Sequence, residues 1–249
     1  MRLLLINPNI SEDVSRLIAA EARRAASPGT ETTVLTAPFG VAYIETRFEA
    51  LIGAYAAAIL VAEHARGNDA VIIAAFGDPG VPAIREVLDI PVIGLSESAL
   101  ASACLLGRRF SIVAISRRIT AWYREVVEHN GLIGRLASIR CLDQPLRDIA
   151  AVQADHVVRL TELCTLAVDQ DGADVIVLAG APLAGLARGI AGEIPVPVVD
   201  GVSSAVRHAE SLAALRPGVA RAGSFAPPPA KPNAGLPDAL RELLRRAAA

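Results

Sequence analysis

The hydrophobic pattern of this chain alternates between short, unbroken apolar runs and longer segments in which apolar residues recur with helical spacing. Unbroken apolar runs are typical of parallel strands that are buried on both faces. The expected strands are residues 2–7, 31–36, 70–75, 92–94, 109–115, 137–142, 174–179 and 196–199. The expected helices are residues 11–26, 48–65, 82–88, 97–106, 121–129, 149–169, 183–191 and 203–215. This alternation predicts an α/β fold with doubly wound parallel sheets.

One strand–turn–helix–strand pattern occurs twice. In the first copy, the apolar run 69–75 leads into a turn rich in small residues and ends in the run 90–94. In the second copy, the run 174–180 leads into a similar turn and ends in the run 194–199. A duplicated half predicts two similar lobes related by pseudo-twofold symmetry, with a cleft between them.

The duplication also predicts how the chain divides. We expect residues 1–97, together with about 203–216, to form the first lobe, and residues 98–202 to form the second. Residues 217–249 begin with a stretch rich in Pro, Gly and Ala and end in an amphipathic helix. An extended segment of this kind either packs over the surface of one lobe or contacts another subunit.

A ligand of a parallel α/β sheet binds beyond the carboxyl ends of the strands. Small residues at these ends let backbone N–H groups approach a carboxylate or imide oxygen closely. The predicted ligand-binding residues are Asn9, Ala75, Phe76, Gly77, Asp78, Ser116, Gly180 and Ala181. Of these, Ala75 and Gly180 occupy equivalent places in the two copies and should face each other across the cleft. Neither side chain can carry a proton.

Each polar candidate also has a purely structural interpretation. Asn9 is a common turn residue, and the Gly-Asp-Pro-Gly sequence around Asp78 favours a tight turn. Glu45 fits a ligand contact and an ordinary surface carboxylate about equally well. Asp200 follows a buried strand, where it is suited to cap the next helix. Tyr123 lies on a predicted helix, and helix packing is its simpler interpretation.

Composition excludes several classes of function. Hydrophobic residues make up 53% of the 249 residues and the net charge is −2, with no basic run that indicates nucleic-acid binding. The longest apolar stretch, residues 51–62, is too short to span a bilayer. Residues 1–6 run straight into Asn-Pro-Asn and predict a strand rather than a signal peptide, so a cytoplasmic location is the default expectation.

The sequence predicts no cofactor and no metal site. It has neither the phosphate loop nor the glycine-rich dinucleotide fingerprint. The three cysteines, Cys104, Cys141 and Cys164, lack the short spacings of a zinc site and their odd number argues against a disulfide framework. Core packing is the simplest interpretation of all three.

Seven segments of the chain carry a further signal. They are Ile6–Asn9, Tyr43–Glu45, Phe76–Gly80, Leu106–Ser111, Asp174–Leu178, Pro197–Gly201 and Phe225–Pro232. In this order they resemble the hydantoin racemase branch of the aspartate/glutamate racemase superfamily. The resemblance runs nearly end to end. It implies an isomerase without a cofactor that acts on a small-molecule substrate, and it implies a homo-oligomer.

The resemblance also implies two cysteines that face each other across the cleft, one as base and one as acid. This chain has Ala75 at the first position and Gly180 at the second. Three explanations stay open: artificial removal of the cysteines, a lineage that now performs other chemistry in the same cleft, or a protein that only binds its ligand. The shifted turn with Pro182 beside Gly180 favours a natural change.

From these observations we expect a racemase-family enzyme that acts on a small cyclic ureide, amide or carboxylate by a cysteine-independent, isomerase-type mechanism. Glu45 is the candidate for the replacement acid or base. One alternative is a lyase or hydrolase that opens a ring or removes a carboxyl group. The other is a small-molecule binding protein without catalysis.

Overall fold

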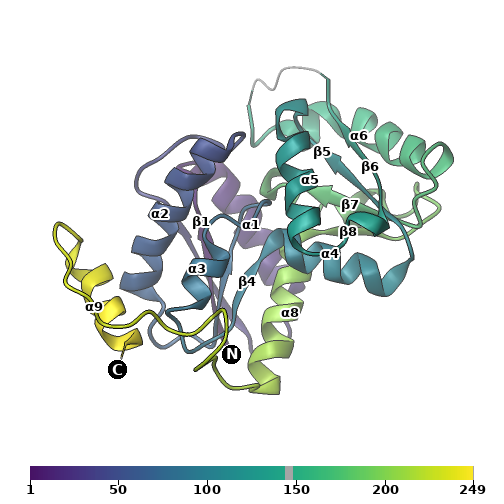
Figure 1. Ribbon diagram of the computed structural model, residues 1–249. Helices are drawn as coiled ribbons and strands as arrows, with labels where there is room; N and C mark the ends of the chain where they lie inside the picture. Colours follow the sequence, from purple (N-terminus) through teal and green to yellow (C-terminus); the bar gives the residue numbers. More distant parts are fainter. Residues whose placement is uncertain (144–147, 249) are drawn as a thin grey trace.

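The structure, a computed structural model, describes residues 1–143 and 148–248 and contains two four-stranded parallel sheets (Figure 1). The strand order is β2-β1-β3-β4 in the first sheet and β6-β5-β7-β8 in the second. The strands are β1 (Arg2–Asn7), β2 (Glu31–Thr36), β3 (Ala70–Ile73), β4 (Val92–Gly94), β5 (Phe110–Ala114), β6 (Leu136–Cys141), β7 (Val175–Ala179) and β8 (Val198–Asp200). The two orders are equivalent, so the predicted α/β fold with two similar lobes is confirmed.

Helices cover both sheets. They are α1 (Glu12–Ala25), α2 (Arg47–His64), α3 (Val81–Arg85), α4 (Leu95–Leu106), α5 (Thr120–His129), α6 (Val152–Asp169), α7 (Leu186–Ile190), α8 (Gly201–Leu215) and α9 (Asp238–Ala247). Short 3₁₀ turns span Arg117–Ile119, Ile133–Arg135 and Ala181–Leu183. Every residue of β3 and β7 is buried, which explains why these strands have apolar side chains on both faces.

The chain crosses between the lobes twice, once from β4 into α4 and once from β8 into α8. Each helix that follows a crossover packs against the opposite lobe. Ala99 and Leu100 of α4 lie in a core with Phe110 of β5, whereas Val202 and Val206 of α8 lie in the core of the first lobe. The two crossovers therefore form the natural hinge between the lobes.

Several predicted element boundaries were wrong. The helix expected over 183–191 is divided into the 3₁₀ turn 181–183 and α7, because Gly185 adopts a left-handed conformation with φ of 81°. The first-half helix expected over 82–88 is only α3, and α6 begins at Val152 rather than at 149. The strand expected over 70–75 ends at Ile73, so Ala75 belongs to the turn after it.

The segment after α8 returns along the first lobe, and α9 packs against α2 with Leu243 buried (Figure 1). On the way, the Phe225 ring lies 5.7 Å from the guanidinium carbon of Arg85. Within residues 1–143 and 148–248, no helix is both long and apolar enough to cross a bilayer.

Candidate functional site

A cavity lies between the lobes at the carboxyl ends of β3 and β7. Its lining consists of Asn9, Tyr43, Ile44, Ala74, Ala75, Phe76, Ile115, Ile119, Tyr123, Gly180, Ala181 and Pro182. Ala75 and Gly180 thus share the wall of one cavity. The cavity volume is about 40 Å³, far below the ~300 Å³ at which small-molecule pockets begin. The cavity in this arrangement of the lobes is therefore too small for a hydantoin-sized ligand.

Gly77 and Asp78 in the turn after β3 were also predicted to bind the ligand, but they do not line this cavity. The Gly77 N–H donates to Ser96 Oγ at 2.5 Å. The Asp78 carboxylate accepts from the N–H groups of Ser96 at 2.8 Å and Glu97 at 2.9 Å, so it caps the first turn of α4. Burial, and next the negative charge of Glu97, raise the pKa of Asp78 to about 7. The structural interpretation of Asp78 accounts for all of these contacts.

Gly77 is required by its contact with the single tryptophan. It has φ of +108°, and an added Cβ would lie 2.2 Å from the Trp122 ring. We expect Gly77→Ala to destabilise the protein by more than about 2 kcal/mol, through backbone strain and overpacking. Gly189→Ala is the matched control, because nothing lies within 4 Å of its added Cβ. Urea unfolding of the two variants measures the difference, and equal midpoints would contradict the expectation.

Backbone N–H groups supply the hydrogen-bond donors of the cavity. Among the described residues, the N–H groups of Phe76, Gly180 and Ala181 have no acceptor within the protein. The N–H groups of Ala75 and Asp78, by contrast, are bonded to Ile73 and Ala75 carbonyls. Three donors around one small space suit a carbonyl, imide or carboxylate oxygen that carries negative charge.

Asn9 adds a side-chain amide to this wall. Its Oδ1 accepts from Asn7 Nδ2 at 3.1 Å and from the Ser11 N–H at 2.9 Å. These bonds fix the orientation of the amide and occupy its acceptor. Its NH₂ group donates to no other described residue, and Asn9 belongs to the cavity lining, so this donor can serve a ligand oxygen.

Tyr43 and Tyr123 are the two ionisable side chains of the cavity lining. Burial, followed by hydrogen bonding to the Glu45 carboxylate, raises the pKa of Tyr43. Burial also raises the pKa of Tyr123, which packs against Phe76 with ring centroids 4.7 Å apart. Both phenols are therefore protonated at neutral pH. Sequence reasoning did not select them, although Ile119 and Tyr123, four residues apart, mark a helix face that points into the cavity.

Glu45 is hydrogen-bonded to Tyr43 but is not part of the cavity lining. It accepts a hydrogen bond from the Ser116 hydroxyl and lies 3.8 Å from Arg118 Nε, so it joins the two lobes. Ser116 is likewise occupied with Glu45 rather than placed on the wall. A second bridge at this mouth of the cleft is the ion pair between Arg47 of α2 and Glu125 of α5.

The comparisons with known proteins agree with this architecture. The family model described as Asp/Glu/Hydantoin racemase matches residues 3–209. A hydantoin racemase of Paenarthrobacter aurescens is 36% identical over 236 residues, with 93% of this chain and 99% of the relative covered. The chain belongs to the Asp/Glu/hydantoin racemase family.

Two further family members extend the comparison. A hydantoin racemase of Pseudomonas sp. (strain NS671) is 32% identical and covers 86% of this chain and 87% of its own length. The solved structure of an allantoin racemase from Klebsiella pneumoniae superimposes with a TM-score of 0.91 at 35% identity, covering 96% of this chain and 98% of the other. The hydantoin racemase branch is thereby confirmed.

Cys104, Cys141 and Cys164 do not line the cavity. Burial raises the pKa of Cys164 to about 12 and also raises the pKa of Cys141, so neither favours the thiolate. No cluster of three or more His, Cys, Asp or Glu side chains in residues 1–143 and 148–248 is arranged to hold a metal ion.

Proposed function

We propose that this racemase-family protein binds a small cyclic ureide, amide or carboxylate in the interlobe cavity and exchanges a carbon-bound proton of that ligand. The observation that carries the proposal is the group of N–H donors at Phe76, Gly180 and Ala181 beside a protonated Tyr43. The relatives are a hydantoin racemase and an allantoin racemase. Hydantoin and allantoin contain the carbonyl and imide oxygens that such donors recognise.

The acid and base in this proposal are a relay of Tyr43 and Glu45 rather than two thiols. The ligand C–H bond breaks as its proton moves to the Tyr43 oxygen and the Tyr43 proton moves to the Glu45 carboxylate. The electron pair left on carbon delocalises into the adjacent carbonyl, whose oxygen accepts from the backbone N–H groups. The protons on Glu45 and Tyr43 then exchange with solvent, and a solvent-derived proton returns from Tyr43 to the carbon, so the exchange needs no cofactor. In this proposal Glu45 still accepts a proton, but it receives that proton from Tyr43 and not directly from the ligand.

Entry of the ligand requires the lobes to separate. The contacts that close the mouth are the ion pair Arg47–Glu125, with both side chains more than half exposed, and the bonds of Glu45 to Ser116 and Arg118. Exposed ion pairs contribute only about 0–1 kcal/mol each. The ion pair Arg47–Glu125 therefore adds little to the free energy that opening the mouth requires.

Proton NMR in D₂O tests the function directly, with 5-substituted hydantoins and allantoin as probes. We expect loss of the carbon-bound proton signal faster than in a protein-free control. A single relay reaches one face of the ligand, so deuterium should enter faster than circular dichroism of the ligand changes. New product signals would instead support a lyase or hydrolase. An unchanged spectrum with every probe would contradict proton exchange.

Binding without catalysis is the second candidate function. Two observations favour it. Ala75 and Gly180 occupy the positions where the resemblance implies cysteines, and both tyrosines of the cavity are protonated. A ligand that binds only the folded state raises the melting temperature as its concentration rises. Such stabilisation by hydantoin or allantoin, together with an unchanged NMR spectrum, would establish this alternative.

We also propose that the chain self-associates. Phe48, Leu51 and Tyr55 form an exposed apolar stripe along α2, and Phe39 packs beside Tyr55 with ring centroids 6.1 Å apart. Several large apolar side chains clustered on an exposed surface are typical of protein–protein interfaces. Sedimentation equilibrium should give a mass above the 25.9 kDa of one chain, and a monomer mass at all concentrations would contradict the proposal.

A further inference from the structure

The second turn of the cavity wall, Gly180–Gly185, packs into the cores of both lobes at once. Ala181 and Ala184 lie in the apolar core of the first lobe, with side chains of β1, α1 and α8. Leu183, between them, lies in the core of the second lobe. Since Gly180 and Ala181 line the cavity, whatever holds this turn also determines the distance between the two cavity walls.

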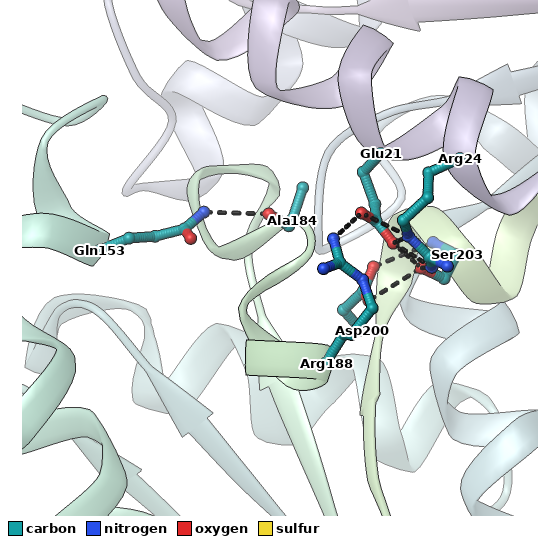
Figure 2. Close-up of polar contacts among 7 residues, drawn as sticks. All are labelled: Glu21, Arg24, Gln153, Ala184, Arg188, Asp200 and Ser203. Atoms are coloured by element: carbon teal, nitrogen blue, oxygen red, sulfur yellow. Dashed lines mark hydrogen bonds and ion pairs between the residues drawn. The ribbon is translucent and has the colours of Figure 1, made fainter. Parts of the chain in front are cut away.

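Gln153 of α6 holds the turn from the side of the second lobe. Its Nε2 donates to the carbonyl oxygens of Pro182 at 2.8 Å and Ala184 at 3.0 Å, the latter bond being visible in Figure 2. Pro182 has no N–H, so the turn contributes one backbone donor fewer to its own structure. The two bonds from Gln153 connect the turn to a long helix that lies outside the cavity lining.

Glu21 of α1 holds the same turn from the side of the first lobe (Figure 2). Only 4% of its surface is exposed. It accepts from Arg24 Nη2 at 2.5 Å and from Ser203 Oγ at 2.5 Å, and its Oε2 lies 3.4 Å from Arg188 Nη2 of α7. An added Cβ on Gly185 would lie 2.7 Å from Glu21 Oε2, so the carboxylate packs directly on the end of the turn.

The electrostatic balance keeps Glu21 charged. Burial by itself would raise its pKa, but hydrogen bonds from Arg24 and Ser203 outweigh burial and the pKa is lowered. Asp200, at the end of β8, accepts from the Ser203 N–H at 2.9 Å. Its second oxygen lies 2.9 Å from Ser203 Oγ, whose single proton is donated either to Asp200 or to Glu21. The residues bonded around Glu21 thus include Ser203 at the start of α8, which follows one of the two crossovers between the lobes. Unlike the exposed ion pair at the mouth, the Glu21 carboxylate is shielded from solvent.

We propose that Glu21 and Gln153 are positioning residues: they hold the turn Gly180–Gly185 between the lobes and so set the place of Gly180 and Ala181 opposite Ala75. When the mouth opens, the turn keeps its position relative to the hinge. The consequence for ligand binding rests on the proposed function of the cavity, whereas the mechanical role of the two residues does not.

Glu21→Gln and Gln153→Leu test the proposal at nearly constant side-chain size. The first removes the charge that holds Glu21 against the turn through Arg24, Arg188 and Ser203. The second removes both hydrogen bonds from Gln153 to the turn. The matched control is Glu162→Gln, which removes a carboxylate from an exposed ion pair with Arg159 on α6. Amide hydrogen exchange, measured by mass spectrometry, reports on the turn without any ligand. The Leu183 and Ala184 amides, bonded to the Gly180 and Ala181 carbonyls, should exchange about tenfold faster in both variants.

Peptides that cover the first turn, residues 75–81, should exchange at the parent rate in both variants and in the control. Unchanged exchange at residues 183–184 would overturn the proposal, and so would an equal increase over both lobes. Calorimetric titration with hydantoin and allantoin adds the second readout: affinity should fall about tenfold for each variant and stay constant for Glu162→Gln. If the parent binds neither probe, the proposed function fails while hydrogen exchange still decides the role of Glu21 and Gln153.

Discussion

Ala75→Cys combined with Gly180→Cys should create proton exchange on 5-substituted hydantoins at least about 10²-fold faster than the parent. Both positions line the same cavity, and the internal duplication makes them equivalent. A thiol on each wall supplies a base on one face of the ligand and an acid on the other. With two opposed groups, inversion should keep pace with deuterium uptake, which distinguishes the double variant from the parent in the NMR and circular dichroism assays.

The two substitutions should differ in their effect on stability. Gly180 has φ of +113°, a conformation that a cysteine adopts with a strain of about 1–3 kcal/mol, although the nearest atom to an added Cβ is 3.5 Å away. No such strain applies at Ala75, so its variant should unfold like the parent. Ala75→Ser with Gly180→Ser is the control for size. A folded double-cysteine variant without exchange would show that the cavity has diverged beyond its bases.

Tyr43→Phe should lower the rate of proton exchange about 10²-fold or more, because it removes the hydroxyl of the cavity lining that is hydrogen-bonded to Glu45. Glu45→Gln should produce a similar loss, since the proton then has no carboxylate to reach. The measurement is the rate of deuterium uptake with saturating hydantoin, together with the Michaelis constant. A change confined to the Michaelis constant would assign Tyr43 to binding alone.

Tyr55→Phe is the matched control for this loss. Tyr55 is exposed on α2 and lies outside the cavity lining, so its variant should exchange at the parent rate. Tyr123→Phe separates the two phenols of the cavity: if it, rather than Tyr43→Phe, stops exchange, the relay is assigned to the wrong tyrosine. Full activity of both cavity variants would exclude a phenol as the acid or base.

The site was predictable in part, and the limits have a physical cause. Sequence reasoning selected Asn9, Ala75, Phe76, Gly180 and Ala181, and the structure brings these five residues together around one cavity. They are found from sequence because each follows the carboxyl end of a strand, and strands are recognisable from their own residues. Sequence reasoning also selected Gly77, Asp78, Ser116 and Glu45. These residues lie next to the lining, but they are hydrogen-bonded to other protein groups.

The sequence by itself determined the strands, the duplication, the doubly wound sheets and the family of this protein, because each depends on residue patterns that persist along the chain. Only the tertiary structure decided which donors and acids are available to a ligand. Gly77 is bonded to Ser96, Glu45 to Ser116 and Glu21 to Ser203, pairs that are 19, 71 and 182 residues apart. A hydrogen-bonding group is available only when no such distant partner occupies it, and this depends on how the two lobes pack together.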